Sequence, residues 1–456
     1  MTMEVLLDRP NRGGVRWSIA NSASLGDGSR AEEARSQDSV VAELAGLLAR
    51  LRHLGDRDAA VTSAVRIDRI ALLEQVKAAV SGAQVAEMVQ FAVGRVEEQR
   101  SADVHPRSLG RGIADEIALA CHVSPAAGSR RLALARALWF DLPETYAALR
   151  SGRVSEWVAT LVSRETSHLD ALRRRSVDAE LAQRDLGSLS PRQAAGTARV
   201  LAYRADPLAA VERARTEEKE RRVTVRPAPD TMAILTAYLP AAHAIAAYAA
   251  LGRAADSTVA TGDRRTRGQI MADTLVQRAT GQAQADDISI EIGLVMPIET
   301  LTQASGARPA ELLGYGPLPA PLARELLRST KGQLFLRRLF AAPRTASGGG
   351  QIIGGEDRRR RFTGALARLV TARDQHCRDP FCDAPIRHLD HITRHSEQGT
   401  TTLANGRGVC ARGNYTREMP GWQVKLLDTG LLGRPHTISV TTPTGHTYVS
   451  RAPDPP

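Results

Sequence analysis

Helical spacing dominates the hydrophobic pattern of this chain, and alternating patterns are short and few. From Val40 onward, through more than half of the 456 residues, apolar positions recur at the intervals of an amphipathic helix. Ala194, Ala195, Ala198 and Leu201, for example, fall on one helical face. The pattern predicts a mainly α protein with small β elements.

Proline marks several of the predicted helix starts. The pairs Ser124-Pro125, Leu142-Pro143 and Ser190-Pro191 are each typical of a cap followed by proline at the first helical position. Gly152 is expected to end the helix that starts at Pro143. The run from 113 to 138 predicts two helices joined by a tight turn. A DNA-reading helix pair has this form, but so do many ordinary helical bundles.

Alternation predicts strands in three places. Val223–Val225 precedes a proline, Ile288–Ile292 alternates apolar with polar residues, and His436–Arg451 is expected to form a hairpin that turns at Pro443–Gly445.

The stretch Thr231–Gly252 has no formal charge and is long enough to cross a bilayer. It is mostly alanine and contains Pro240 at its middle. We interpret it as two helices of a non-membrane protein, the second beginning at Pro240.

Composition changes suggest five segments. They are a disordered N-terminus (1–38), a helical domain (39–342), a Gly- and Ser-rich linker (343–357), a Cys- and His-containing module (358–425) and a C-terminal hairpin and tail (426–456).

Basic residues are in excess. Lys and Arg number 61 against 50 Asp and Glu, which gives a net charge of +11 and a pI near 10. This balance indicates a polyanionic partner, most often nucleic acid. All but four of the basic residues are arginines, so a codon bias with no polyanion partner is the alternative interpretation.

The start of the chain lacks the apolar run of a signal peptide, and we expect a cytoplasmic protein. In that compartment clustered thiols favour metal binding over disulfides. Cys377, Cys382 and Cys410 form such a cluster, whereas Cys121 lies in an apolar run and is expected to be a small buried residue.

Four residues near these cysteines have the chemistry of phosphodiester hydrolysis. Asp390 and His391 end a short extended run, and Asn405 and Asn414 follow, the latter on a helix expected near Cys410. A neutral histidine can deprotonate water, and carboxylate and amide oxygens suit a hard divalent ion such as Mg²⁺. The Asn405 amide is expected to pin the connecting loop.

The stretch RDQHCRDPFCDAPIRHLDHITRHSEQGTTTLANGRGVCARGNYTREMPGW resembles an HNH endonuclease module, the ββα-metal fold, in its His-Asn-Asn version. Upstream, RRLALARALWFDLPETYAALRSGRVSEW, GDRRTRGQIMADTLV and PAELLGYGPLPAPLAREL resemble the helical domain of unknown function of the 13E12 repeat proteins. The resemblance covers most of the chain.

This resemblance implies a role for each residue. Asp390 and Asn414 would bind the catalytic ion, His391 would be the general base and Asn405 an orienting residue. Cys377, Cys382 and Cys410 would hold a structural zinc. Gly413 stands where the family has a fourth cysteine, which leaves three possibilities: His376 substitutes, His388 substitutes, or the site is empty. Gln398-Gly399 stands where the family commonly has Gly-Gly.

The predicted function is therefore metal-dependent cleavage of double-stranded DNA. Phosphate contacts are expected from four arginines of the module: Arg394, Arg407, Arg412 and Arg417. Two alternatives remain: a DNA-binding protein with a decayed, inactive nuclease module, as in a mobile repeat element, and a helical interaction protein with a vestigial module.

Overall fold

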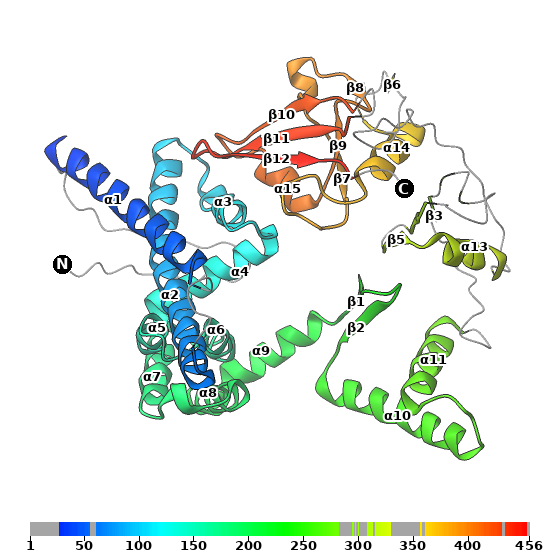
Figure 1. The fold of residues 1–456 in the computed structure, drawn as a ribbon, viewed down its shortest axis with the longest axis horizontal. Helices are drawn as coiled ribbons and strands as arrows, with labels where there is room; N and C mark the ends of the chain where they lie inside the picture. Colours follow the sequence, from blue (N-terminus) through cyan, green and yellow to red (C-terminus); the bar gives the residue numbers. More distant parts are fainter. Residues whose placement is uncertain are drawn as a thin grey trace. The chain divides into compact units, whose positions relative to one another are not determined.

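A computed structural model describes residues 27–54, 61–281, 294–295, 297, 300, 308–312, 315–329, 356–357, 361–430 and 434–453. It is mainly helical with small β-sheets (Figure 1), as the hydrophobic pattern predicts. Two compact units divide the chain: one of residues 1–110 and 134–201, the other of residues 111–133 and 202–456. Among the described residues, no helix combines the length and apolarity needed to cross a bilayer.

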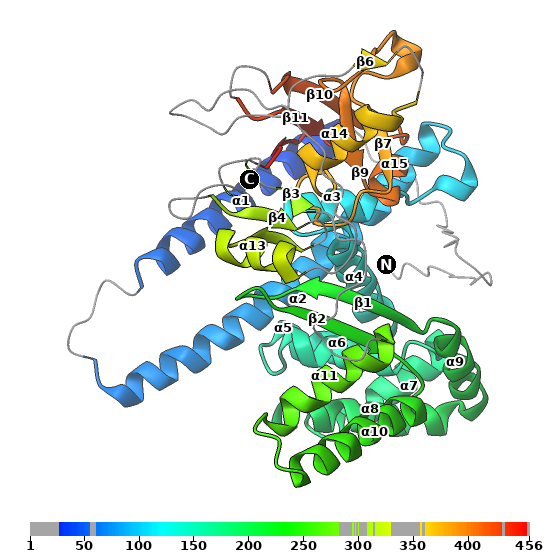
Figure 2. The same cartoon turned by 90° about the vertical axis from the view of Figure 1, so that its right-hand side faces the viewer.

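The first unit is a helical bundle built around the long helix α2 (Ser63–Ser101), against which α5 (Pro143–Arg150) and α6 (Glu156–Glu165) pack (Figure 2). Its other helices are α1 (Asp27–Arg52), η1 (Pro106–Ser108), the π-helix η2 (Ala137–Asp141), α7 (Ala171–Ala182), η3 (Leu186–Ser188) and most of α8 (Pro191–Ala205).

Close helix contact in this bundle depends on small residues. A Cβ on Gly82 of α2 would lie 2.8 Å from Cγ of Arg150, so only glycine allows the two helices to approach this far. The phenol of Tyr146 donates to the Gly82 carbonyl at 3.2 Å. An Ala- and Gly-rich composition can therefore support a close-packed helical core with few aromatics.

Proline starts α4 (Pro125–Arg136), α5 and α8 as predicted. The cap of α5 is not local, however. Leu142 provides no side-chain cap, and the buried carboxylate of Asp178 on α7 accepts hydrogen bonds from the backbone N–H groups of Glu144 and Thr145, at 2.7 and 3.2 Å. Gly152, with φ 76°, follows the end of the helix as expected.

The second unit begins with α3 (Ile113–Ala120) and the first part of α4, and resumes at α9 (Pro207–Lys219). Its next elements are β1 (Arg222–Pro227), β2 (Ala233–Tyr238), α10 (Ala241–Ala260), α11 (Arg267–Thr280), the sheet of β3 (Leu294–Val295), β4 (Ala310–Leu312) and β5 (Gly316–Leu318), and α13 (Ala320–Ser329).

The C-terminal elements of this unit are β6 (Glu356–Asp357), α14 (Gly364–Asp374), β7 (His388–His391), η4 (His395–Glu397), β8 (Thr401–Thr402), β9 (Gly406–Val409), α15 (Ala411–Thr416), β10 (Gln423–Asp428), β11 (Thr437–Thr441) and β12 (Thr447–Arg451).

Two local predictions need correction, and a third is confirmed with an addition. The N-terminal disordered segment was expected to reach residue 38, but α1 begins at Asp27. The first half of Thr231–Gly252 is strand β2 rather than a helix, because its backbone pairs with β1 along six residues. The C-terminal hairpin is confirmed as β11 and β12, but β10 adds a third strand beside β11.

Two predicted segments lie largely outside the described residues: the strand at 288–292 entirely, and the linker at 343–357 except for its last two residues.

A buried ion-pair network joins α14 to the C-terminal sheet. The Asp374 carboxylate is fully buried and pairs with Arg373 and Arg378, at 2.7 and 3.0 Å. It also accepts the Gly408 N–H of β9 at 2.7 Å. Arg378 in turn donates to the carbonyls of His436 and Ser450, which lie just before β11 and in β12. The network thereby holds together α14, β9 and the C-terminal sheet, which are distant in sequence.

His436 lies against this network in a neutral form. Its Nε2 is 2.8 Å from the Ala404 carbonyl, and its Nδ1 faces Nη1 of Arg378 at 3.5 Å. Burial, together with the nearby charge of Arg373, lowers the pKa of His436 to about 4. The unfolded chain would bind a proton at this histidine near pH 6.5, whereas the folded chain does not.

Stability should therefore fall as the pH decreases from about 6.5 to about 4, by roughly 3 kcal/mol from His436, since a tenfold change in proton affinity corresponds to about 1.4 kcal/mol. Hydrogen exchange of the β11 amides, corrected for the intrinsic effect of pH, measures this. His436→Gln should reduce the acid sensitivity, while His446→Gln, at an exposed position of the same hairpin, should not. Equal pH profiles for wild type and His436→Gln would contradict the assignment.

Candidate functional site

The predicted site residues lie in a hairpin followed directly by a helix. β7 pairs antiparallel with β9, and Asp390 and His391 stand opposite Arg407 and Gly406. α15 begins two residues after β9 and contacts both strands. The strand end that contains Asp390 and His391 and the helix that contains Asn414 therefore belong to one small substructure.

Asn405 closes the loop of this hairpin, as predicted. Its Oδ1 accepts the Thr393 N–H at 2.8 Å, and its Nδ2 donates to the carbonyls of Thr393 and Thr400, at 3.0 and 2.8 Å. Gly399 is required in the same loop, because a Cβ there would lie 1.9 Å from the Thr393 carbonyl oxygen. The side chain of Asn405 is buried, so it fixes the backbone that follows His391.

The His391 ring is held by groups that sequence reasoning did not identify. Its Nε2 is 2.9 Å from the Thr401 hydroxyl, and its ring centroid lies 4.6 Å from that of Phe362. The ring is half-buried. Thr401 and Phe362 therefore fix the imidazole itself, while Asn405 fixes the backbone beside it.

Asp390 is ionised, and one of its two carboxylate oxygens accepts hydrogen bonds from neighbouring arginines. Its Oδ2 accepts hydrogen bonds from Nε and Nη2 of Arg407, at 3.1 and 3.0 Å, and from Nη1 of Arg417 at 2.5 Å. Burial opposes ionisation, but the two guanidinium groups outweigh it and lower the pKa of Asp390. Among the described residues, none donates to the other oxygen, Oδ1.

Asn414 is half-buried on α15, and its backbone N–H donates to the Cys410 carbonyl at 3.1 Å. Within the described part of the chain, its side-chain amide has no hydrogen-bond partner. The free oxygens of Asp390 and Asn414 are hard donors of the kind that a divalent cation such as Mg²⁺ prefers.

Two of the four arginines expected to bind DNA are internal instead. Arg407 is fully buried between Asp390 and Asp379, whose Oδ1 accepts from Nη1 at 2.9 Å. Arg417 is buried as well and donates to Asp390 and to the carbonyls of His391 and Ile392. The prediction that these two arginines contact DNA phosphates is wrong, because a guanidinium enclosed by protein acceptors does not reach a DNA backbone.

The other two arginines are partly exposed and paired. Arg394 contacts Glu418 at 2.6 Å. Arg412 forms a bidentate pair with Asp115 of α3, at 2.7 and 2.8 Å, and Nη1 donates to the Ser129 hydroxyl of α4 at 2.5 Å. The two side chains are equally exposed, but the carboxylate that pairs with Arg394 is exposed, whereas the one that pairs with Arg412 is largely buried.

The helix pair α3–α4, expected from the run 113–138, thus contacts the C-terminal module. His122, in the turn between the helices, stacks on Phe381 with ring centroids 4.6 Å apart. Gly112 has φ 88°, and a Cβ there would lie 3.0 Å from Nε1 of Trp422. Together with the Arg412–Asp115 pair, these contacts pack the helix pair against the C-terminal module.

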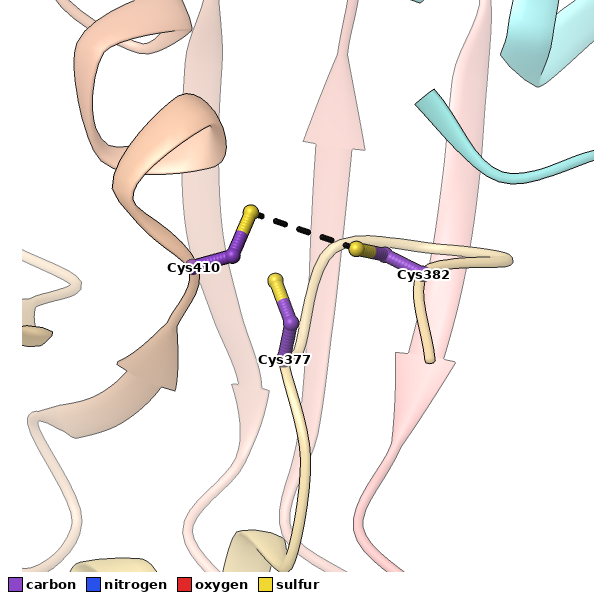
Figure 3. A group of neighbouring side chains, drawn as sticks. All are labelled: Cys377, Cys382 and Cys410. Atoms are coloured by element: carbon purple, nitrogen blue, oxygen red, sulfur yellow. Dashed lines mark hydrogen bonds between the residues drawn. The ribbon is translucent and has the colours of Figure 1, made fainter. Parts of the chain in front are cut away.

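The three clustered cysteines converge in the interior (Figure 3). Their sulfur atoms all lie within 4.8 Å of one another, and those of Cys382 and Cys410 are 4.0 Å apart. Hydrogen bonds from the thiols of Cys377 and Cys382 lower the pKa of Cys410, and its sulfur also accepts the Gly413 N–H at 3.3 Å. Such a group could hold a metal ion, and three thiolates favour a soft or borderline one.

Neither histidine considered as a fourth ligand joins this group, which among the described residues consists of the three cysteines alone. The ring of His388 faces Tyr415 instead, with ring centroids 6.2 Å apart. The carboxylate of Asp379 lies beside Gly413, the position at which the resemblance implies a fourth ligand. The sequence feature that could have identified Asp379 is its position between Cys377 and Cys382.

Residues 70–374 match the family described as a domain of unknown function (DUF222). The match spans more than half of the chain, which therefore belongs to this family. It ends at Asp374, so the hairpin, α15 and the three cysteines lie beyond the matched region. Neither a search of curated proteins nor a search of solved structures found a match.

The two asparagines of the site should behave differently when truncated. Asn405→Ala would leave one N–H and two carbonyls of a buried loop without partners, which typically costs about 1–3 kcal/mol. Hydrogen exchange across residues 393–405 should therefore accelerate. Asn414→Ala is the matched control and should leave this exchange unchanged. Unaltered protection in Asn405→Ala would show that the loop is held by other contacts.

The Asp115–Arg412 pair should couple the helix pair to the module by about 1–2 kcal/mol, as a bidentate, partly buried ion pair. A double-mutant cycle of Asp115→Asn and Arg412→Gln, read by exchange protection of α3, measures this coupling. The exposed Arg394–Glu418 pair is the control and should give less than about 1 kcal/mol. Additive effects at Asp115 and Arg412 would argue against docking through this pair.

Proposed function

We propose that this protein is a metal-dependent DNA endonuclease whose site is the β7–β9–α15 substructure. The observation that carries the proposal is that Asp390, His391 and Asn414 lie on one antiparallel hairpin and on the helix that contacts it. The resemblance of residues 373–422 to an HNH module supports the same conclusion, as does the net charge of +11.

In this proposal the His391 imidazole accepts a proton from the attacking water. The Thr401 hydroxyl and the Phe362 ring keep the imidazole in place, so that little reorientation is needed when the water is deprotonated. A divalent ion bound by Asp390 and Asn414 would supply the positive charge that neutralises the leaving oxygen.

Substrate contact would come from basic groups at the surface of the module. Arg361, Arg368 and Arg387 are exposed there, and Arg394 is partly exposed. These residues replace the buried Arg407 and Arg417 as candidates for contacts with DNA phosphates.

A second function is favoured by one specific observation. Arg407 and Arg417 both donate to Oδ2 of Asp390, and two guanidinium groups beside a carboxylate repel a divalent cation. If that repulsion prevails, the module binds DNA without cleaving it. Cleavage assays distinguish the two functions.

His391→Ala should lower the rate of plasmid cleavage in Mg²⁺ or Mn²⁺ by at least about 10²-fold, the contribution typical of a general base. DNA affinity should barely change, because a neutral imidazole contributes little attraction for phosphate. Asp390→Asn should also abolish cleavage, and EDTA should stop the wild type. His446→Ala is the control, since that histidine is exposed in the C-terminal hairpin.

Retained DNA binding with no cleavage in either metal would instead support the inactive DNA-binding protein. Cleavage that continues undiminished in EDTA would exclude the metal-dependent mechanism.

A further inference from the structure

Position 413 holds no side chain, although its spacing from Cys410 is that of two ligands of one ion. An ideal Cβ placed on Gly413 would lie 1.7 Å from Oδ2 of Asp379 and 2.9 Å from its Cγ. The first distance is about one covalent bond length. The Asp379 carboxylate thus fills the space that a ligand side chain at position 413 would take.

We propose that Asp379 is the fourth ligand of a metal site formed with Cys377, Cys382 and Cys410. Carboxylate oxygens are among the protein ligands of zinc, together with thiolates and imidazoles. Asp379 lies on the loop between the first two cysteines, and its side chain is mostly buried. Its Oδ1 is held by Arg407 at 2.9 Å, while Oδ2 accepts no hydrogen bond from any described residue.

The charges around this ligand set are consistent with zinc. Three thiolates and one carboxylate carry more negative charge than a divalent ion neutralises, and the buried guanidinium of Arg407 contributes positive charge beside them. Oδ2 does not lie within 4.8 Å of all three sulfurs, so metal binding draws the carboxylate toward them. The site is structural and does not depend on whether the module cleaves DNA.

X-ray absorption of the full-length protein loaded with one equivalent of zinc tests the ligand set directly. We expect three sulfurs at about 2.3 Å and one oxygen at about 2.0–2.2 Å. Four sulfurs, or a nitrogen in place of the oxygen, would overturn the proposal.

Asp379→Asn tests which residue supplies the oxygen. Residues that only orient a metal ligand cost about 10–100-fold in affinity when they are changed, so loss of a ligand should cost at least about 100-fold. Competition with a chelator measures this affinity. The matched control is Asp383→Asn, an exposed carboxylate next to Cys382 in the same loop, which should bind zinc like the wild type. Wild-type affinity in Asp379→Asn would show that water completes the site and would overturn the proposal.

A second variant decides the matter if Asp379→Asn does not fold. Gly413→Cys alone should not improve zinc binding, because its Cβ would collide with Asp379. Asp379→Ser combined with Gly413→Cys removes the collision and supplies a fourth sulfur. Tight zinc binding through four sulfurs in this double variant would show that a cysteine at position 413 can replace Asp379 as the fourth ligand, which supports the proposal. Failure of the double variant to bind zinc overturns it.

Discussion

The fully buried guanidinium of Arg407 is the interaction on which the C-terminal module depends. It bridges Asp379, beside the cysteines, and Asp390, at the end of β7. A buried charge is tolerated only when it is paired and hydrogen-bonded, and removing one partner of such a pair typically costs about 3–5 kcal/mol. Because Arg407 stands opposite Asp390 in the hairpin register, this requirement also fixes how β7 and β9 align.

The same interaction sets a limit on the chemistry of the site. Arg407 and Arg417 keep Asp390 ionised, which a ligand for a divalent ion must be, but they also occupy one of its two oxygens. The carboxylate therefore serves two purposes, as an internal counter-charge and as a candidate ligand. An ion at this position would bind through Oδ1, against the repulsion of two neighbouring cations. The arginine contacts that stabilise the module at Asp390 would therefore weaken its affinity for an ion.

Local features of the structure were predictable from sequence. Proline at helix starts, the Gly152 helix end and the β11–β12 hairpin each depend on backbone preferences of a few adjacent residues. The Asn405 loop contacts were also predictable, because an asparagine amide satisfies backbone groups within a short loop.

Pairings between distant residues were not predictable in this way. Arg412 and Asp115 are 297 positions apart, and nothing in either segment indicates the other. Charge alone made Arg407 and Arg417 appear to be phosphate contacts, since sequence does not reveal which arginine is buried against a carboxylate. Strand β2 differs from the predicted helix for a related reason: its backbone pairing with β1 outweighs the helical preference of its alanines.

Residues 111–133 connect the family domain with the candidate site. They lie within the matched region 70–374, yet they fold with the C-terminal part of the chain. Arg412, two residues before Asn414 on α15, pairs with Asp115, and His122 stacks on Phe381 in the cysteine loop. These contacts hold α3 and the start of α4 against the protein's own module. A helix pair held in this way packs against α15 and the cysteine loop and so supports their position.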